Sequence, residues 1–227
     1  MSDLFFGEFS TDVTPPEVTN PSPGNGLIGV ARDADIEFDI TDTETGVDTT
    51  AVIVYIGGVK AYDGGAGGFQ AGYITGSTFL DMGGGTWHML INPAADLGSY
   101  VLVAVTVDGH DLAPVANVMS QYSWSFTTID DEAPYVQNNT PTGPDTPVTA
   151  LIEFDLKDDG LGVDVDSLNV TVGGVAAIVG GAFVSPFDGL SSAITGTPAS
   201  YHVVIDANPD YDEWTTYEVI VNARDLA

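Results

Sequence analysis

The chain has 227 residues, of which 33 are Asp or Glu and only 4 are Lys or Arg, so its formal net charge at pH 7 is −29. A surface this negative repels nucleic-acid phosphates and anionic membrane surfaces, which excludes nucleic acid as a partner and disfavours membrane contact. The absence of Cys excludes disulfides and thiolate metal sites. A hydrophobic content of 44% is sufficient for packed cores, and the many carboxylates leave oxygen ligands for divalent cations.

The first thirteen residues, Met1 to Val13, lie outside the pattern of the rest of the chain and are expected to form an N-terminal arm. They contain no basic region and no long apolar run, so the sequence predicts neither an export signal nor membrane insertion. The arm nevertheless carries an apolar group without an evident core, made of Leu4, Phe5, Phe6 and Phe9. Two interpretations stay open: the group docks on a partner subunit, or it packs on the first domain as part of an extra edge strand.

The rest of the chain contains an internal duplication. The segment IEFDI at 36–40 returns as IEFDL at 152–156, an offset of 116 residues (152 − 36). Three further pairs match in the same order: 46–48 with 162–164, 87–91 with 201–205, and 111–113 with 225–227. So many matches in one order indicate two copies of one domain, over residues 14–129 and 130–227.

Each copy is predicted to consist of β-strands. Apolar and acidic residues alternate through 35–40, and Val occupies every second position from 101 to 107, which is the period of a strand with one buried face. The segments 87–91 and 122–126 alternate in the same way. No window combines helical spacing with helix caps, so almost no helix is expected. Short strands separated by Gly, Pro and Asn are typical of a sandwich, and the predicted fold class is all-β with two tandem β-sandwiches.

A series of short motifs runs through the first copy. It comprises Pro-Pro-x-Val at 15–18, Pro-x-Pro-Gly-x-Gly at 21–26, the run VARDADIEFDI at 30–40, and Asp-x-x-x-Gly-Val-Asp at 42–48. This series resembles bacterial immunoglobulin-like (Big-type) modules, and the likeness extends from Thr14 to Ala227. The resemblance implies two immunoglobulin-like sandwiches in tandem. Such modules recur in prokaryotic surface adhesins and in virion proteins of tailed phages, and they share no catalytic site.

Acidic residues gather at two equivalent loops and at the boundary between the copies. They are Asp39, Asp42 and Asp48 in the first loop, Asp155, Asp158 and Asp164 in its twin, and Asp130 and Asp131 at the boundary. Crowded oxygen ligands beside a Gly suit Ca²⁺, the only cofactor that the sequence suggests. The spacing is not that of an EF-hand, and Gly-Val-Asp also forms tight turns with an Asx-type hydrogen bond. Calcium and a solvated turn or hinge therefore remain alternatives.

No catalytic residues are predicted. His88 and His202 occupy equivalent strand positions, and a residue repeated in both copies is more typical of architecture than of catalysis. No nucleophile elbow is present, and among 33 acids, pairs arise by chance, so they do not indicate a glycosidase. The chain is therefore expected not to be an enzyme.

The second copy has no counterpart of residues 122–127, so its last strand is expected to be missing. Because an unpaired sheet edge is a liability, two explanations compete. Either the native polypeptide is longer, or a neighbouring chain donates the strand.

These features predict a non-enzymatic structural protein of a tailed virus, in a fibre, tail, baseplate or capsid-surface appendage, acting in assembly, projection and host-surface contact. The expected location is the virion, and the expected partners are other virion or filament subunits and a host-surface receptor or glycan. The alternative is a prokaryotic cell-surface adhesin or an extracellular filament subunit, which the lack of an export signal disfavours. The aromatic residues Phe69, Tyr73 and Phe79 could line a sugar-binding face, but core positions are expected for them.

Overall fold

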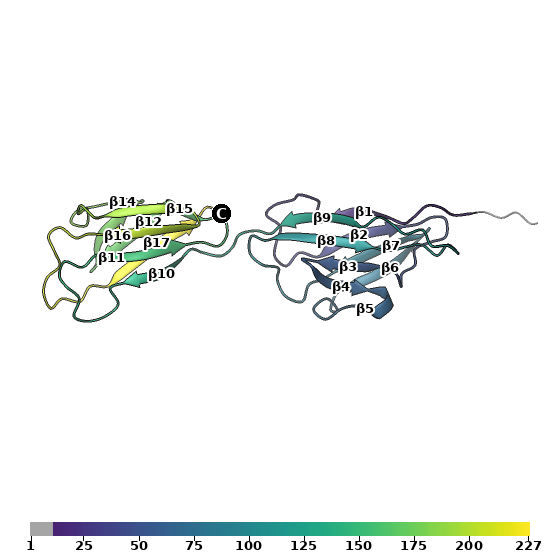
Figure 1. The fold of residues 1–227 in the computed structure, drawn as a ribbon, viewed down its shortest axis with the longest axis horizontal. Helices are drawn as coiled ribbons and strands as arrows, with labels where there is room; N and C mark the ends of the chain where they lie inside the picture. The colour runs from purple at the N-terminus through teal and green to yellow at the C-terminus, as the bar shows by residue number, and fades with distance from the viewer. Residues whose placement is uncertain (1–10) are drawn as a thin grey trace, which may run out of the picture. The chain divides into compact units, whose positions relative to one another are not determined.

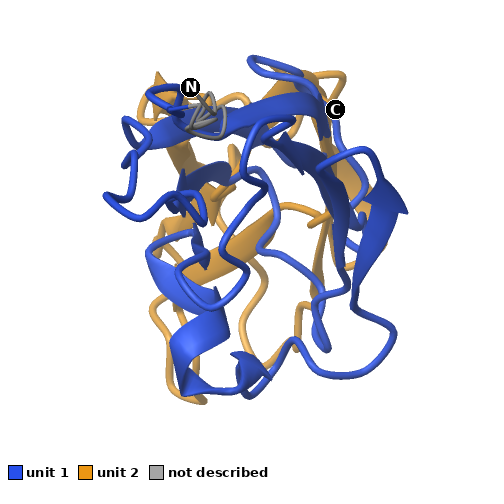
Figure 2. Ribbon diagram, turned by 90° about the vertical axis from the view of Figure 1, so that its right-hand side faces the viewer, with its two compact units in different colours: residues 1–129 blue, residues 130–227 orange. Residues whose placement is uncertain are grey.

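The computed structural model describes residues 11–227, so the docking hypothesis for Leu4, Phe5, Phe6 and Phe9 lies outside the described residues. The chain divides into two compact units, residues 1–129 and residues 130–227, which are coloured separately in Figure 2. In the described part, every regular element is a strand except one short 3-10 turn at Gly64–Ala66, so the all-β prediction is confirmed. None of these residues forms a helix that is long and apolar enough to pass through a bilayer.

Unit 1 is built from two antiparallel sheets (Figure 1). In sheet order, the first contains β1 (Glu17–Ser22), β2 (Ile36–Thr41), β7 (Thr86–Ile91) and β6 (Thr78–Gly83). The second contains β5 (Gly68–Phe69), β4 (Val59–Asp63), β3 (Ile53–Ile56), β8 (Leu102–Asp108) and β9 (Tyr122–Thr127).

The core of unit 1 lies between these two sheets, as the alternating pattern predicts. From the first sheet, β2 buries Ile36, Phe38 and Ile40 completely, while its acidic residues face outward. From the second sheet, Trp124 meets Phe38 edge to face, with ring centroids 5.7 Å apart. Unit 1 is therefore a two-layer β-sandwich.

One strand start differs from the sequence pattern. Val101 was expected to share the buried face of Val103, but it is 39% exposed and precedes β8. The preceding Tyr100 has a φ of 47°, which breaks the extended backbone before the strand begins. The alternation that buries side chains therefore starts at Val103.

Unit 2 repeats this plan. In sheet order, its first sheet contains β10 (Tyr135–Thr140), β11 (Ile152–Lys157), β16 (Ser200–Ile205) and β15 (Ala193–Thr197). Its second sheet contains β14 (Ala182–Phe183), β13 (Val175–Val179), β12 (Val163–Val172) and β17 (Val219–Asp225). The register repeats as well: Asp39 pairs with His88 across β2 and β7, and Asp155 pairs with His202 across β11 and β16.

The second sheets of the two units end differently. In unit 1, β9 pairs with β8 from Leu102 to Val107, and Val105 is fully buried. In unit 2, β17 is the last strand of its sheet among the described residues, and Val219, the counterpart of Val105, is 38% exposed. The apolar face of β17 is therefore less covered than that of β8.

The three aromatic residues considered for sugar binding pack against the core of unit 1. Phe69, Tyr73 and Phe79 are partly buried against it. The buried ring of Tyr62 packs edge to face against two of them, with its centroid 5.0 Å from that of Phe69 and 5.3 Å from that of Phe79. Their position accords with the core role preferred from the sequence.

Candidate metal centre

Three carboxylates from distant parts of unit 1 come together at one end of the sandwich. Asp12 precedes β1, Asp42 follows β2, and Asp111 follows β8. One oxygen from each lies within 4.8 Å of the others. Asp42 and Asp111 are buried, and Asp12 is half-buried. Three acidic oxygens at this spacing are an arrangement that can hold a metal ion.

The Asp42 side chain is held in place by the loop that follows it. Its Oδ1 accepts backbone N–H bonds from Glu44 at 3.2 Å, Thr45 at 3.0 Å and Gly46 at 2.8 Å. Gly46 has a φ of 87°, a conformation that glycine adopts readily and that closes the loop back on the carboxylate. Oδ2, by contrast, is buried and has no hydrogen-bond partner.

The other two carboxylates of the cluster are fixed by equally specific contacts. Asp111 accepts N–H bonds from Ala113 and Asn117 at Oδ1, and its Oδ2 accepts one from the Asn117 amide at 2.6 Å. Burial raises the pKa of the Asp111 carboxyl, but the bonds from Asn117 and Ala113 and a contact with Asp12 outweigh it and lower the pKa. Because its pKa is lowered, the Asp111 carboxyl is ionised at neutral pH. The third carboxylate, Asp12, accepts a hydrogen bond from the Thr45 hydroxyl at 2.6 Å.

Unit 2 contains the same arrangement, made by Asp130, Asp158 and Asp225, again with one oxygen of each within 4.8 Å of the others. Asp158 Oδ1 accepts N–H bonds from Gly160 and Gly162, as Asp42 does from its own loop. Asp130 Oδ2 accepts the Leu161 N–H at 2.6 Å. The two clusters occupy corresponding places in the two copies.

Backbone pairing brings the acidic loop and the third carboxylate together in each unit. In unit 1, Val47 bridges to Asp111, and the Leu112 N–H bonds to the Gly46 carbonyl at 2.9 Å. In unit 2, Val163 pairs with Asp225, and the Leu226 N–H bonds to the Gly162 carbonyl at 2.8 Å. The corresponding pairs follow the sequence offsets of 116 and 114.

The structure brings only some of the eight acids suggested by the sequence into these clusters. Asp42, Asp158 and Asp130 belong to them, whereas Asp39, Asp48, Asp155, Asp164 and Asp131 do not. Asp48 accepts the Thr50 hydroxyl at 2.6 Å and makes a local turn. Asp164 lies in β12 opposite Arg224, and Asp131 is exposed.

Asp39 and Asp155 serve a different arrangement, which is also duplicated. Asp39 accepts the Asn20 amide at 2.8 Å and contacts His88 Nδ1 at 2.8 Å. Asp155 contacts Asn138 at 2.7 Å and His202 at 2.9 Å in the same way. Each histidine thus bonds to the acid directly across the sheet in both copies.

The hydrogen bonds in this second arrangement predict a specific acid response. The hydrogen bond from the Asn20 amide lowers the pKa of the Asp39 carboxyl below its ordinary value of 3.8, with burial acting against it and His88 acting with it. The hydrogen bonds from Asn138 and His202 lower the pKa of the Asp155 carboxyl in the same way. A depressed folded-state pKa gives stability that is present above the ordinary value and lost as the pH falls through the depressed one. The melting-temperature difference between the wild type and Asp39→Asn/Asp155→Asn is therefore expected to be largest near neutral pH and to shrink below about pH 4. Melts in about 0.5 M NaCl, where general charge repulsion is screened, measure it. A difference that stays constant down to about pH 2.5 would contradict the assignment.

Three cluster residues were missed by the sequence argument: Asp12, Asp111 and Asp225. Asp111 lies with Asp12 and Asp42, and Asp225 lies with Asp130 and Asp158. The signal was present in the duplication, because Asp111-Leu112-Ala113 returns as 225–227 and Asp12 stands four residues before Pro16 as Asp130 stands before Pro134.

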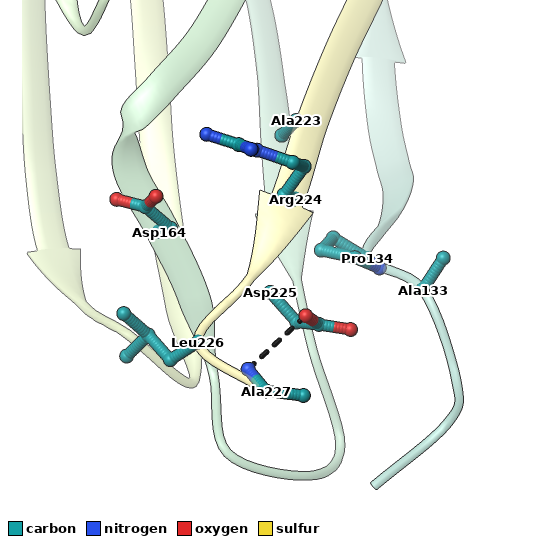
Figure 3. A pocket seen from close by; sticks show the side chains of 8 residues that line it. All are labelled: Ala133, Pro134, Asp164, Ala223, Arg224, Asp225, Leu226 and Ala227. Carbon is teal, nitrogen blue, oxygen red and sulfur yellow. Dashed lines mark hydrogen bonds between the residues drawn. The ribbon is translucent and has the colours of Figure 1, made fainter.

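An open groove in unit 2 lies beside β17 (Figure 3). Its described lining consists of Ala133, Pro134, Asp164, Ala223, Arg224, Asp225, Leu226 and Ala227. The charged side chains of this lining are Asp164, Arg224 and Asp225. Asp225 links the groove to the acid cluster, and its Oδ1 accepts the Ala227 N–H at 3.1 Å.

Comparison of the chain with protein-family models and with curated proteins finds no match.

Proposed function

We propose that this chain is a non-enzymatic structural protein of a tailed-virus particle. Its two sandwiches, of the immunoglobulin-like kind, serve as building and spacing modules in a fibre, tail, baseplate or capsid-surface appendage. Their work is assembly and projection, with host-surface contact as a further role. The motifs at 15–18, 21–26 and 42–48, which resemble bacterial immunoglobulin-like modules, support this setting.

One observation carries the structural role: the notable polar contacts occur twice, at matching positions. The His88–Asp39 contact of 2.8 Å returns as the His202–Asp155 contact of 2.9 Å. The acid cluster around Asp42 returns around Asp158. A polar network that is present in both copies is best explained as part of the fold. A catalytic function would instead require a site with its own geometry and chemistry.

The high negative charge supports a role in a particle that must stay dispersed. A net charge of −29 favours solubility and suppresses non-specific association. The carboxylates that face outward from β2 and β11 alternate with fully apolar core residues, so charge and packing are separated strand by strand.

The experiment is immunogold electron microscopy of the producing culture, with an antibody raised against residues 11–227. The proposal expects gold on virus particles, and the labelled part separates a capsid appendage from a tail or fibre. Pre-immune serum and particles of an unrelated virus from the same host are the controls. Gold on the cell envelope, or on filaments leaving it, would replace the virion setting with that of an adhesin.

A further inference from the structure

The Asp42 carboxylate has one buried oxygen that no described group satisfies. Asp42 is 3% exposed, and its Oδ2 has no hydrogen-bond partner, although its Oδ1 accepts three. A buried carboxylate oxygen with no partner is costly, because it has lost its water and gained nothing in exchange. This oxygen belongs to a side chain gathered with those of Asp12 and Asp111, whose own carboxylates would repel it.

Within the described part of unit 1, none of the hydrogen bonds to these three carboxylates comes from Lys or Arg. Apart from the contact between the Asp12 and Asp111 carboxyls, the hydrogen bonds to these three acids come from backbone N–H groups, the Thr45 hydroxyl and the Asn117 amide. Donors of this kind orient the carboxylates without neutralising them. A cation among the three oxygens would supply both the missing partner of Asp42 and the missing charge.

The donor set selects the kind of cation. All three side-chain ligands are carboxylate oxygens, which suit hard cations and lack the nitrogen or sulfur that zinc sites use. The carboxylates come from three separate segments, and the rest of the shell would be carbonyl oxygens and water. Ca²⁺ accepts six to eight oxygens in flexible geometry, whereas Mg²⁺ demands near-ideal octahedral geometry.

We propose that each unit binds one Ca²⁺, through Asp12, Asp42 and Asp111 in unit 1 and through Asp130, Asp158 and Asp225 in unit 2. The repetition of the cluster is a second, independent support. The loop N–H bonds to Oδ1, the Val47–Asp111 bridge and the Leu112–Gly46 bond all return in unit 2. The proposal does not depend on the virion setting.

Bound Ca²⁺ would join three segments of each unit that are far apart in the sequence. In unit 1 these are the segment before β1, the loop after β2 and the segment after β8. Binding to the folded state only would stabilise the unit by mass action, and the segment that carries Asp12 would be fixed to the sandwich.

The experiment is calorimetric titration of the chelator-treated whole chain with CaCl₂, followed by thermal melts at constant ionic strength. The wild type is expected to bind two Ca²⁺ per chain, with dissociation constants of about 10⁻⁵ to 10⁻³ M. Addition of 1 mM Ca²⁺ is expected to raise the melting temperature relative to chelator by about 2 °C at the weak end of this range and by about 10 °C or more at the tight end. Asp42→Asn and Asp158→Asn are each expected to leave one bound ion, and the double variant none.

The choice of asparagine keeps the fold testable, because its amide oxygen still accepts the loop N–H bonds. Asp81→Asn is the matched control. Asp81 is exposed, and among the described residues its side chain accepts a hydrogen bond only from the Gly83 N–H of its own turn. This substitution removes the same charge outside both clusters. The Asp81→Asn variant should bind two ions, as the wild type does. Unchanged binding in the double variant would assign the ions to other carboxylates and overturn the proposal. The proposal would also be overturned if CaCl₂ gave no binding heat and the melts in Ca²⁺ and in chelator were identical. In that case, a melting temperature that rises from pH 7 to pH 5 would indicate that the clustered carboxylates share a proton.

Discussion

Replacing Phe38 with Ala is expected to lower the free energy of unfolding of unit 1 by about 3–5 kcal/mol. Phe38 lies in the middle of β2, is fully buried, and meets Trp124 of the opposite sheet edge to face at 5.7 Å. Its removal leaves a cavity between the two sheets, and the neighbouring strands cannot close it without breaking their own pairing. Urea unfolding followed by tryptophan fluorescence measures the loss, because Trp124 reports directly on this core.

The duplication supplies a matched variant for this prediction. Phe154 occupies the equivalent position in β11 and is 1% exposed. Phe154→Ala is therefore expected to lower the free energy of unfolding of unit 2 by a similar amount. The only tryptophan of unit 2, Trp214, is 99% exposed, so its emission is already that of a residue in water. Phe154→Ala should therefore shift the circular-dichroism transition and leave the fluorescence transition in place. A fluorescence midpoint that Phe38→Ala does not lower would show that this residue is not central to the packing of unit 1.

The sequence was sufficient for the strands that alternate most regularly. In β2 and β11, apolar residues alternate with polar, mostly acidic residues, which is the pattern of a strand with one buried face. Val101 shows where this reasoning ends, because the same alternation continues past the point at which Tyr100 leaves the extended conformation. The change of backbone conformation at Tyr100 does not alter the pattern of apolar residues, so that pattern could not predict it.

The acid clusters were found only in part, for a reason of topology. Asp39 and Asp42 are near each other in the sequence, but Asp39 projects from a strand toward His88, while Asp42 lies beyond the strand end in a loop that folds over its carboxylate. Asp111 lies in the same cluster because β8 ends beside that loop, and no local pattern gives this closeness. Comparing the two copies position by position is the sequence argument that would have found it.

Unit 2 is expected to unfold before unit 1, with a urea midpoint lower by about 1 M or more. Among the described residues, the core of unit 1 has 19 buried apolar side chains and that of unit 2 has 13. The sheet of unit 2 ends at β17, where Val219 and Ile220 are 38% and 46% exposed, whereas β9 covers β8 in unit 1. Less apolar burial means a smaller driving force for folding.

The exposed position of Trp214 makes this order measurable in the intact chain. In chelator, which removes any contribution from divalent cations, the far-ultraviolet circular dichroism is expected to fall in two steps. The fluorescence of Trp87 and Trp124, both in unit 1, is expected to follow only the second step. Phe154→Ala should move the first step to lower urea and leave the second unchanged. Coincident transitions by both probes would mean that the two units unfold together, and the open edge at β17 would then not limit the stability of unit 2.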